Sequence, residues 1–233
     1  FTKDGNNMYF TRNNFNDGKK GKDGNKITLL KIYKATLIDN RWQKATELSF
    51  NSDSYSVAHP VLSPDEKTMY FASDMPGTKG QSDLWKVSIN GDGSFGTPVN
   101  LGDAINTEGK ETFPMITDEN ELYFATDGHP GLGGLDIFMS RMNPDGTFQA
   151  PINVGAPANS PQDDFAYLID TKTRKGFLSS NREGGQGFDD IYKFLETRKL
   201  ICEQELSGIV TDLETGEILP NTKVTLSDEK FVM

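Results

Sequence analysis

The chain has 233 residues, enough for one large β domain or for one domain and part of another. Its formal net charge of −10 argues against a surface that binds nucleic acid or an anionic membrane, because both need a basic footprint. Cys202 is the only cysteine, which excludes an internal disulfide. No apolar run approaches the ~20 residues of a membrane-spanning helix, so we expect no direct membrane insertion.

The first predicted strand, NMYFTRNNF at residues 7–15, carries a Tyr-Phe pair that returns along the chain. A polar insertion follows, NDGKKGKDGNK, which contains Lys19, Lys20 and Lys22 and is typical of a loop. The next predicted strand, LLKIYKATL, carries Lys31 where later copies have an acid. Because residue 1 falls inside this first copy, we expect the N-terminal part of the repeat to be incomplete.

The two central copies of the repeat run from Met69 to Gly102 and from Leu122 to Gly155. They align without a gap at an offset of 53 residues, and 13 of 34 positions are identical. A weaker fourth copy, KGFLSSNREGGQGFDDIYKF, keeps the thirteen-residue spacing from its aromatic residue to its acid. The residues that define the repeat are Tyr70, Phe71, Asp83, Tyr123, Phe124, Asp136, Phe177 and Asp190.

Each copy is predicted to form four short strands. The first is SVAHPVLS, ETFPMIT or FAYLID, the second holds the aromatic pair, and the third is DLWKV, DIFMS or DIYKF. A turn such as NGDG or NPDG then leads to the fourth, FGTPVNLG or FQAPINVG. Four-stranded units of this length predict an all-β fold, a β-propeller with at least four blades and a fifth left open. The last copy ends after three strands, and the first lacks its opening strand.

A different pattern begins after residue 198. LSGIVTDLETGEILPNTKVTLSD reads as a strand, a turn and a second strand. It resembles the opening of the carboxypeptidase-regulatory-like fold, a small transthyretin-like β-sandwich. We therefore expect residues 1–198 to be the propeller and residues 199–233 to be the truncated start of this second domain.

The glycine-rich loop LYFATDGHPGLGGLDIF looks at first like a phosphate or metal site. Its glycines do not have dinucleotide-binding spacing, and its counterpart in the preceding copy lacks His129. His59 and His129 are too far apart in sequence to suggest zinc, and His59 takes the place of Phe113 and Phe165 in other copies. We expect neither a metal nor another cofactor.

The recurring acids Asp83, Asp136 and Asp190 allow two interpretations: a ring of carboxylates, or turn acids that accept backbone N–H groups. The second is favoured. The neighbouring acids Asp163 and Asp164 suggest a glycosidase pair, but adjacent residues of a strand point to opposite faces. With no nucleophile motif either, the sequence predicts a protein that is not an enzyme.

The stretch SPDEKTMYFAS, residues 63–73, resembles the WD-repeat-like propeller repeat of TolB. The longer pattern, from the YFA(S/T)D segment to P(V/I)N(L/V)G, is similar to propellers of the OmpA family of Bacteroidetes. In that family a carboxypeptidase-regulatory-like domain and a peptidoglycan-binding domain follow the propeller. The resemblance implies a periplasmic, outer-membrane-associated protein of the type IX secretion system.

The function expected from this resemblance is a non-catalytic scaffold. Its partners would be other envelope and secretion proteins, with peptidoglycan held by a C-terminal domain that is missing here. Loop residues that differ between copies are the candidate partner contacts: Lys19, Lys20, Lys22, Met75, His129 and Arg182. Two alternatives stay open: a carbohydrate-binding or glycan-processing propeller, and a TolB-like accessory protein that binds a partner peptide in its channel.

Overall fold

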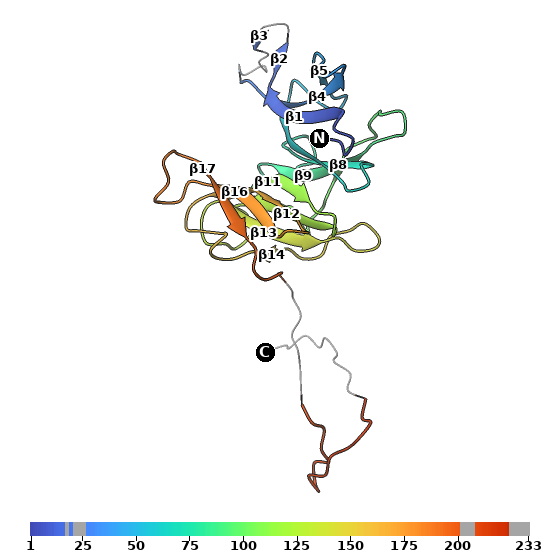
Figure 1. The fold of residues 1–233 in the computed structure, drawn as a ribbon, viewed down its shortest axis with the longest axis vertical. Helices are drawn as coiled ribbons and strands as arrows, with labels where there is room; N and C mark the ends of the chain where they lie inside the picture. Colours follow the sequence, from blue (N-terminus) through green and yellow to red (C-terminus); the bar gives the residue numbers. More distant parts are fainter. Residues whose placement is uncertain (17–18, 21–26, 201–207, 224–233) are drawn as a thin grey trace. The chain divides into compact units, whose positions relative to one another are not determined.

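The computed structural model describes residues 1–16, 19–20, 27–200 and 208–223. The chain divides into two compact units, residues 1–198 and 199–233. The described residues contain strands and turns but no helix, and so no helix that could cross a membrane. Figure 1 shows the strands of the first unit in sequence order from blue to orange.

The first unit consists of four successive antiparallel sheets, the blades of a β-propeller (Figure 1). The predicted fold class is therefore confirmed. The first blade contains β1 (Asn7–Asn13), β4 (Leu30–Ile38), β5 (Arg41–Trp42) and β6 (Thr46–Glu47), with the hairpin β2 (Phe15–Asn16) and β3 (Lys19–Lys20) in the insertion. The second contains β7 (Val57–Leu62), β8 (Thr68–Ser73), β9 (Asp83–Ser88) and β10 (Val99–Asn100). The third contains β11 (Glu111–Ile116), β12 (Glu121–Thr126), β13 (Asp136–Arg141) and β14 (Ile152–Asn153). The fourth contains β15 (Asp164–Ile169), β16 (Lys175–Ser180) and β17 (Asp190–Leu195).

The Tyr-Phe pair of the second blade, Tyr70 and Phe71, links that blade to both of its neighbours. Adjacent residues of a strand point to opposite faces of the sheet. Phe71 therefore packs on the first-blade side, in a cluster with Phe50, while Tyr70 packs on the third-blade side, in a cluster with Phe124. Tyr123 in turn stacks on Tyr167 of the fourth blade, with 4.6 Å between ring centroids. The repeat thus produces a core between every two successive blades.

The short fourth strands are fastened to the third strands by asparagine side chains. Asn106 accepts a hydrogen bond from the Leu84 N–H at 2.8 Å and donates to the Leu84 carbonyl at 3.0 Å. Asn159 makes the same two bonds to Ile137, at 2.8 and 2.9 Å. Because a buried backbone group without a partner is costly, these asparagines complete the ladder where the fourth strand is only two residues long.

In the second unit, residues 208–223 contain one antiparallel bridge between Thr211 and Ile218. The Asp212 carboxylate accepts the N–H groups of Glu214 and Thr215 and so holds the turn between them. The other parts of the predicted strands lie at residues 201–207 and 224–233, outside the described residues. The assignment of this unit as the start of a sandwich domain stays a prediction.

Candidate functional site

The first strands of the second, third and fourth blades share one irregularity. In β7, β11 and β15 the pairing with the next strand shifts by a β-bulge. At each bulge one non-glycine residue has a positive φ: His59 at 56°, Phe113 at 49° and Ala166 at 52°. Pro60 and Pro114 follow the first two, and proline cannot donate to the ladder, so the sequence itself favours a bulge there.

The bulges bring aromatic side chains of three blades into one continuous stack. The His59 ring lies over Phe113 with 3.8 Å between centroids and 17° between planes, and Phe113 contacts Phe165 at 5.0 Å. Sequence comparison correctly placed His59 with Phe113. It was one residue out in the fourth blade, where Ala166 holds the bulge position and Phe165 pairs with Ser179, as Thr112 pairs with Ala125.

His59 lines two cavities. One, of about 260 Å³, is partly polar, with Asp74, Gln81 and Lys110 among its lining residues. The other, of about 290 Å³, is bounded by the first strands of three blades. Its walls are almost wholly apolar: Pro60, Val61, Phe113, Pro114, Met115, Tyr167 and Leu168. We refer to this second cavity as the hub cavity.

His59 is uncharged at neutral pH. Burial lowers the pKa of its imidazole to about 4, because the cation would lose its hydration. Nδ1 lies 2.8 Å from Oγ1 of Thr112, and the His59 backbone N–H donates to Oγ1 of Thr11 at 2.8 Å. The site therefore offers aromatic faces, prolines and a neutral hydrogen-bonding ring. No group of three or more metal-ligating side chains occurs among the described residues.

The acids at the start of the third strands hold the loops that precede them. Asp83 accepts the Lys79 N–H at 2.9 Å, Asp136 accepts those of Leu132 and Gly133 at 2.8 and 2.9 Å, and Asp190 accepts that of Gln186 at 2.8 Å. These are the contacts of turn acids. A Cβ on Gly131 would lie 2.0 Å from the Asp136 carboxylate, so the glycine-rich loop that looks like a phosphate site is folded around its own acid.

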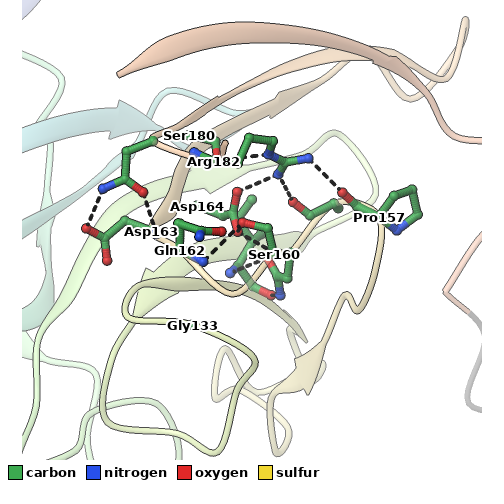
Figure 2. Close-up of polar contacts among 12 residues, drawn as sticks. Gly133, Pro157, Ser160, Gln162, Asp163, Asp164, Ser180 and Arg182 are labelled. Atoms are coloured by element: carbon green, nitrogen blue, oxygen red, sulfur yellow. Dashed lines mark hydrogen bonds and ion pairs between the residues drawn. The ribbon is translucent and has the colours of Figure 1, made fainter. Parts of the chain in front are cut away.

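A second set of buried acids lies at the start of the first strands. The Glu111 carboxylate accepts from the Thr107 N–H at 2.9 Å and from Thr126 Oγ1 at 2.7 Å. Asp164 accepts from Ser160 and forms an ion pair with Arg182 (Figure 2). The neighbouring acid Asp163 is turned away and accepts from Asn181 at 3.0 Å, so the two adjacent acids serve different contacts.

The candidate partner contacts take several places in the structure. Arg182 is engaged within the chain: besides Asp164, it donates to the carbonyls of Pro157 and Ala158, as Figure 2 shows. Met75 is 6% exposed and belongs to the core between the first and second blades. His129 Nε2 lies 3.0 Å from the Ile105 carbonyl. Lys19 and Lys20 form β3, and Lys22 lies outside the described residues.

Sequence reasoning missed the asparagines that fasten the fourth strands and the repeat of the acids that begin the first strands, although it had named Asp164 as one of two neighbouring acids. Both sets obey the same repeat: Asn106 and Asn159 are 53 residues apart, as are Glu111 and Asp164. They lie just beyond Gly102 and Gly155, where the aligned block was closed. Extending the comparison by nine residues would have found them.

No family model matches this sequence, and no curated protein matches it. Among solved structures, the chain is similar to an α-L-arabinofuranosidase from Lactobacillus brevis, with a TM-score of 0.50 and 12% identity over 96% of this chain and 74% of that one. It is also similar to a periplasmic gluconolactonase of Pseudomonas aeruginosa, with a TM-score of 0.49 and 13% identity over 92% of this chain and 61% of that one. At 12% identity, the likeness to the arabinofuranosidase shows the fold alone, a β-propeller.

The prediction that the protein is not an enzyme is corrected by this comparison. The structure with the TM-score of 0.50 is itself a glycosidase, so the fold gives no ground for excluding catalysis. The prediction relied on the absence of a familiar motif. In folds whose functional groups stand on separate loops, these groups come from distant parts of the sequence and leave no local signature.

Proposed function

We propose that the protein is a propeller scaffold of the bacterial cell envelope that binds a polypeptide partner at the hub cavity. The observation that carries this proposal is the cavity itself, about 290 Å³ and apolar, open between the first strands of three blades. Apolar concave sites with a few polar groups at the rim are typical binding sites. Leu168, which is 54% exposed, provides an accessible side chain at the wall.

The setting of this function comes from the sequence resemblance to the OmpA family of Bacteroidetes. It supports a periplasmic, outer-membrane-associated place and a role in type IX secretion, in the manner of the component PorE. The partners would then be other envelope or secretion proteins. A carboxypeptidase-regulatory-like domain after the propeller and a peptidoglycan-binding domain after that belong to the same proposal.

The experiment uses the 233-residue chain as bait in an envelope extract of its own organism, with bound proteins identified by mass spectrometry. Leu168→Glu places a charge at the wall of the hub cavity without disturbing a buried side chain. Val99→Glu is the matched control, because Val99 is 53% exposed and does not line the cavity. Envelope proteins captured by the unmodified chain and by the Val99→Glu chain, but lost with Leu168→Glu, would support the proposal. No capture, or capture unchanged by Leu168→Glu, would contradict it.

A second candidate is a glycan-binding or glycan-processing propeller. The partly polar cavity favours it, because Asp74, Gln81 and Lys110 stand there beside the aromatic ring of His59. The α-L-arabinofuranosidase to which the chain is similar suggests the substrate to try. Calorimetric titration with arabinan oligosaccharides and a hydrolysis assay on an aryl arabinofuranoside would test it. Binding or turnover that Asp74→Asn removes and Leu168→Glu leaves intact would favour the glycan function over the scaffold.

A further inference from the structure

Among the described residues, the fourth blade has no segment along its outer edge like the segments that fasten the other three blades. In the first three blades, a segment lies along the outer edge of the third strand: β6 beside β4, β10 beside β9 and β14 beside β13. Beside β17, no strand pairs at the outer edge among the described residues. An open edge of this kind presents unpaired N–H and C=O groups, which is the usual template for adding a further strand.

The filled edges share one set of hydrogen bonds, centred on the second residue of the third strand in the second and third blades. In those blades it is Leu84 or Ile137, and its N–H and C=O are both bonded by Asn106 or Asn159. In the first blade Asn51 does the same for Ile32, at 3.1 and 2.7 Å.

The same carbonyls accept a second hydrogen bond, from the backbone of the fastening segment. The N–H groups of Leu48, Leu101 and Val154 donate to Ile32, Leu84 and Ile137 at 3.2, 3.1 and 3.1 Å. In the second blade Asn100 also donates to the carboxylate of Asp83 at 2.7 Å. A filled edge is thus recognised by one backbone N–H and one or two asparagines.

Ile191 occupies the corresponding place in the fourth blade. It follows Asp190 and pairs with Ser179, as Leu84 follows Asp83 and pairs with Ala72. Leu84 and Ile137 are fully buried, whereas Ile191 is 77% exposed. By the shared register, the Ile191 N–H and C=O point outward, to the side where the other blades have an asparagine.

The segments that fill the second and third edges define what would fit. Residues 97–107, TPVNLGDAINT, and residues 150–160, APINVGAPANS, share the pattern (V/I)-N-(L/V)-G-x-x-x-N. The pattern requires glycine because Gly102 and Gly155 have φ values of +83° and +72°, which other residues rarely adopt. This conformation turns the chain back, so that the second asparagine of the pattern reaches the third strand.

We propose that the outer edge of β17 is a binding site for an extended polypeptide segment of this pattern, which adds as the fourth strand of the last blade. The residue after the first asparagine donates its N–H to the Ile191 carbonyl. The second asparagine bonds both backbone groups of Ile191, and the first donates to the carboxylate of Asp190. This site is distinct from the hub cavity and does not depend on it.

The probe is a fluorescein-labelled synthetic peptide, TPVNLGDAINT, added to the 233-residue chain and followed by fluorescence anisotropy. We expect saturable binding that weakens at least tenfold when the peptide carries alanine at its second asparagine, which corresponds to about 1.4 kcal/mol. A peptide of the same composition in scrambled order is the control. Absence of binding up to millimolar peptide, or equal binding of the alanine peptide, would overturn the proposal.

Hydrogen exchange read by mass spectrometry locates the bound peptide. We expect slower exchange in the segment 190–195 and no change in 83–88, where β10 already occupies the edge. Protection at 83–88 instead would mean that the peptide displaces β10, and the proposal would fall. Ile191→Pro removes the N–H that the second asparagine needs, and far-UV circular dichroism would show whether that chain is folded. Ile191→Val keeps the N–H and should bind normally.

Discussion

A single side chain, Asn106, shows how a blade with a fourth strand of only two residues satisfies the backbone groups of its third strand. It is 1% exposed, and its amide oxygen accepts the Leu84 N–H, which no backbone group of the short fourth strand reaches. Its Nδ2 donates to the Leu84 carbonyl, which also accepts the Leu101 N–H. Its Nδ2 also donates to Oδ1 of Asn100, so the two asparagines support one another. Buried polar groups of this kind stabilise a fold only while every member of the network is satisfied.

Replacing Asn106 with alanine should therefore destabilise the protein out of proportion to its size. Asn106→Ala leaves the Leu84 N–H without its partner and the Leu84 carbonyl with one partner fewer, and we expect a loss of about 2 kcal/mol in the free energy of unfolding. Equilibrium unfolding in urea measures it. Asn90→Ala is the matched control, since Asn90 lies in an exposed turn and should cost less than about 1 kcal/mol. Equal losses would show that the Asn106 bonds carry no special weight.

His59 makes the stability of the propeller depend on pH. The folded chain holds it neutral, with a pKa of about 4, while the unfolded chain protonates it at its ordinary value of 6.5. Its contribution is complete above pH 6.5 and is lost as the pH falls from 6.5 to 4, by up to about 3 kcal/mol. His59→Phe should keep the stack on Phe113 and remove this part of the acid sensitivity. Urea unfolding of both chains at pH 4.5, 5.5 and 6.5 measures the difference, and the interval from pH 7 to 8 is the control. Parallel curves below pH 6.5 would contradict the assignment.

At the scale of the strand, the first blade shows how the repeat tolerates an exchanged charge. Lys31 stands where Asp83 stands in the second blade, and it is almost fully buried. It forms ion pairs with Glu47 of β6 at 3.0 Å and with Asp53 at 2.7 Å. Burial works to lower the pKa of Lys31, but the bonds to Asp53 and Glu47 outweigh it and leave that pKa raised. In the second blade the acid, Asp83, is on the third strand and its donor, Asn100, is on the fourth. In the first blade the donor, Lys31, is on the third strand and the acid, Glu47, is on β6.

This exchange predicts a specific rescue. Lys31→Asp alone places a third carboxylate beside Glu47 and Asp53 and should cost about 3 kcal/mol of unfolding free energy. Adding Glu47→Asn restores the acid-asparagine pair that Asp83 and Asn100 make, and we expect it to recover about half of that loss. A double-mutant cycle in urea measures the coupling. If Glu47→Asn lowers the unfolding free energy of the Lys31→Asp chain further, Lys31 and Glu47 do not form a pair equivalent to Asp83 and Asn100.

The strands themselves were predictable because the same sequence pattern recurs in four copies along the chain. Alternation around Tyr70 and Tyr123 and the turn residues between strands were enough to place β8, β9, β12 and β13. The prolines after His59 and Phe113 favour a bulge in two first strands, but Ala166 is followed by Tyr167, so the fourth blade carries no such signal. A one-residue shift inside a first strand also leaves the spacing at the second strand unchanged. Hence Phe165 was aligned with His59, although Ala166 has the positive φ.

The hub cavity was beyond sequence reasoning for a related reason. It forms only where three bulges meet, and no copy of the repeat contains it alone. The variable loop residue Met75 was also wrongly interpreted as a partner contact. It differs between copies because it packs in the core, and not because it faces a partner. Variation between copies marks freedom from the repeat, and it does not distinguish core from surface.

At the scale of the molecule, each blade is stabilised by the blade after it, and the fourth blade has no successor among the described residues. Phe177 takes the place of Tyr70 and Tyr123, yet it is 46% exposed where they are buried. Leu168 and Leu195 are exposed on the same face, at 54% and 57%. The fourth blade therefore has an apolar face of the kind that packs against a next blade, and the described residues leave this face uncovered.

This asymmetry can be measured by making one substitution in two blades. Ile137→Ala removes a fully buried side chain between the third and fourth blades and should cost about 3 kcal/mol in the free energy of unfolding. Ile191→Ala, at the equivalent place in the fourth blade, should cost less than about 0.5 kcal/mol, because that side chain is 77% exposed. Urea unfolding of both chains at several protein concentrations provides the comparison. A loss for Ile191→Ala that approaches the loss for Ile137→Ala would mean that the face is covered in solution. Dependence of that loss on protein concentration would then identify the cover as a second copy of the chain.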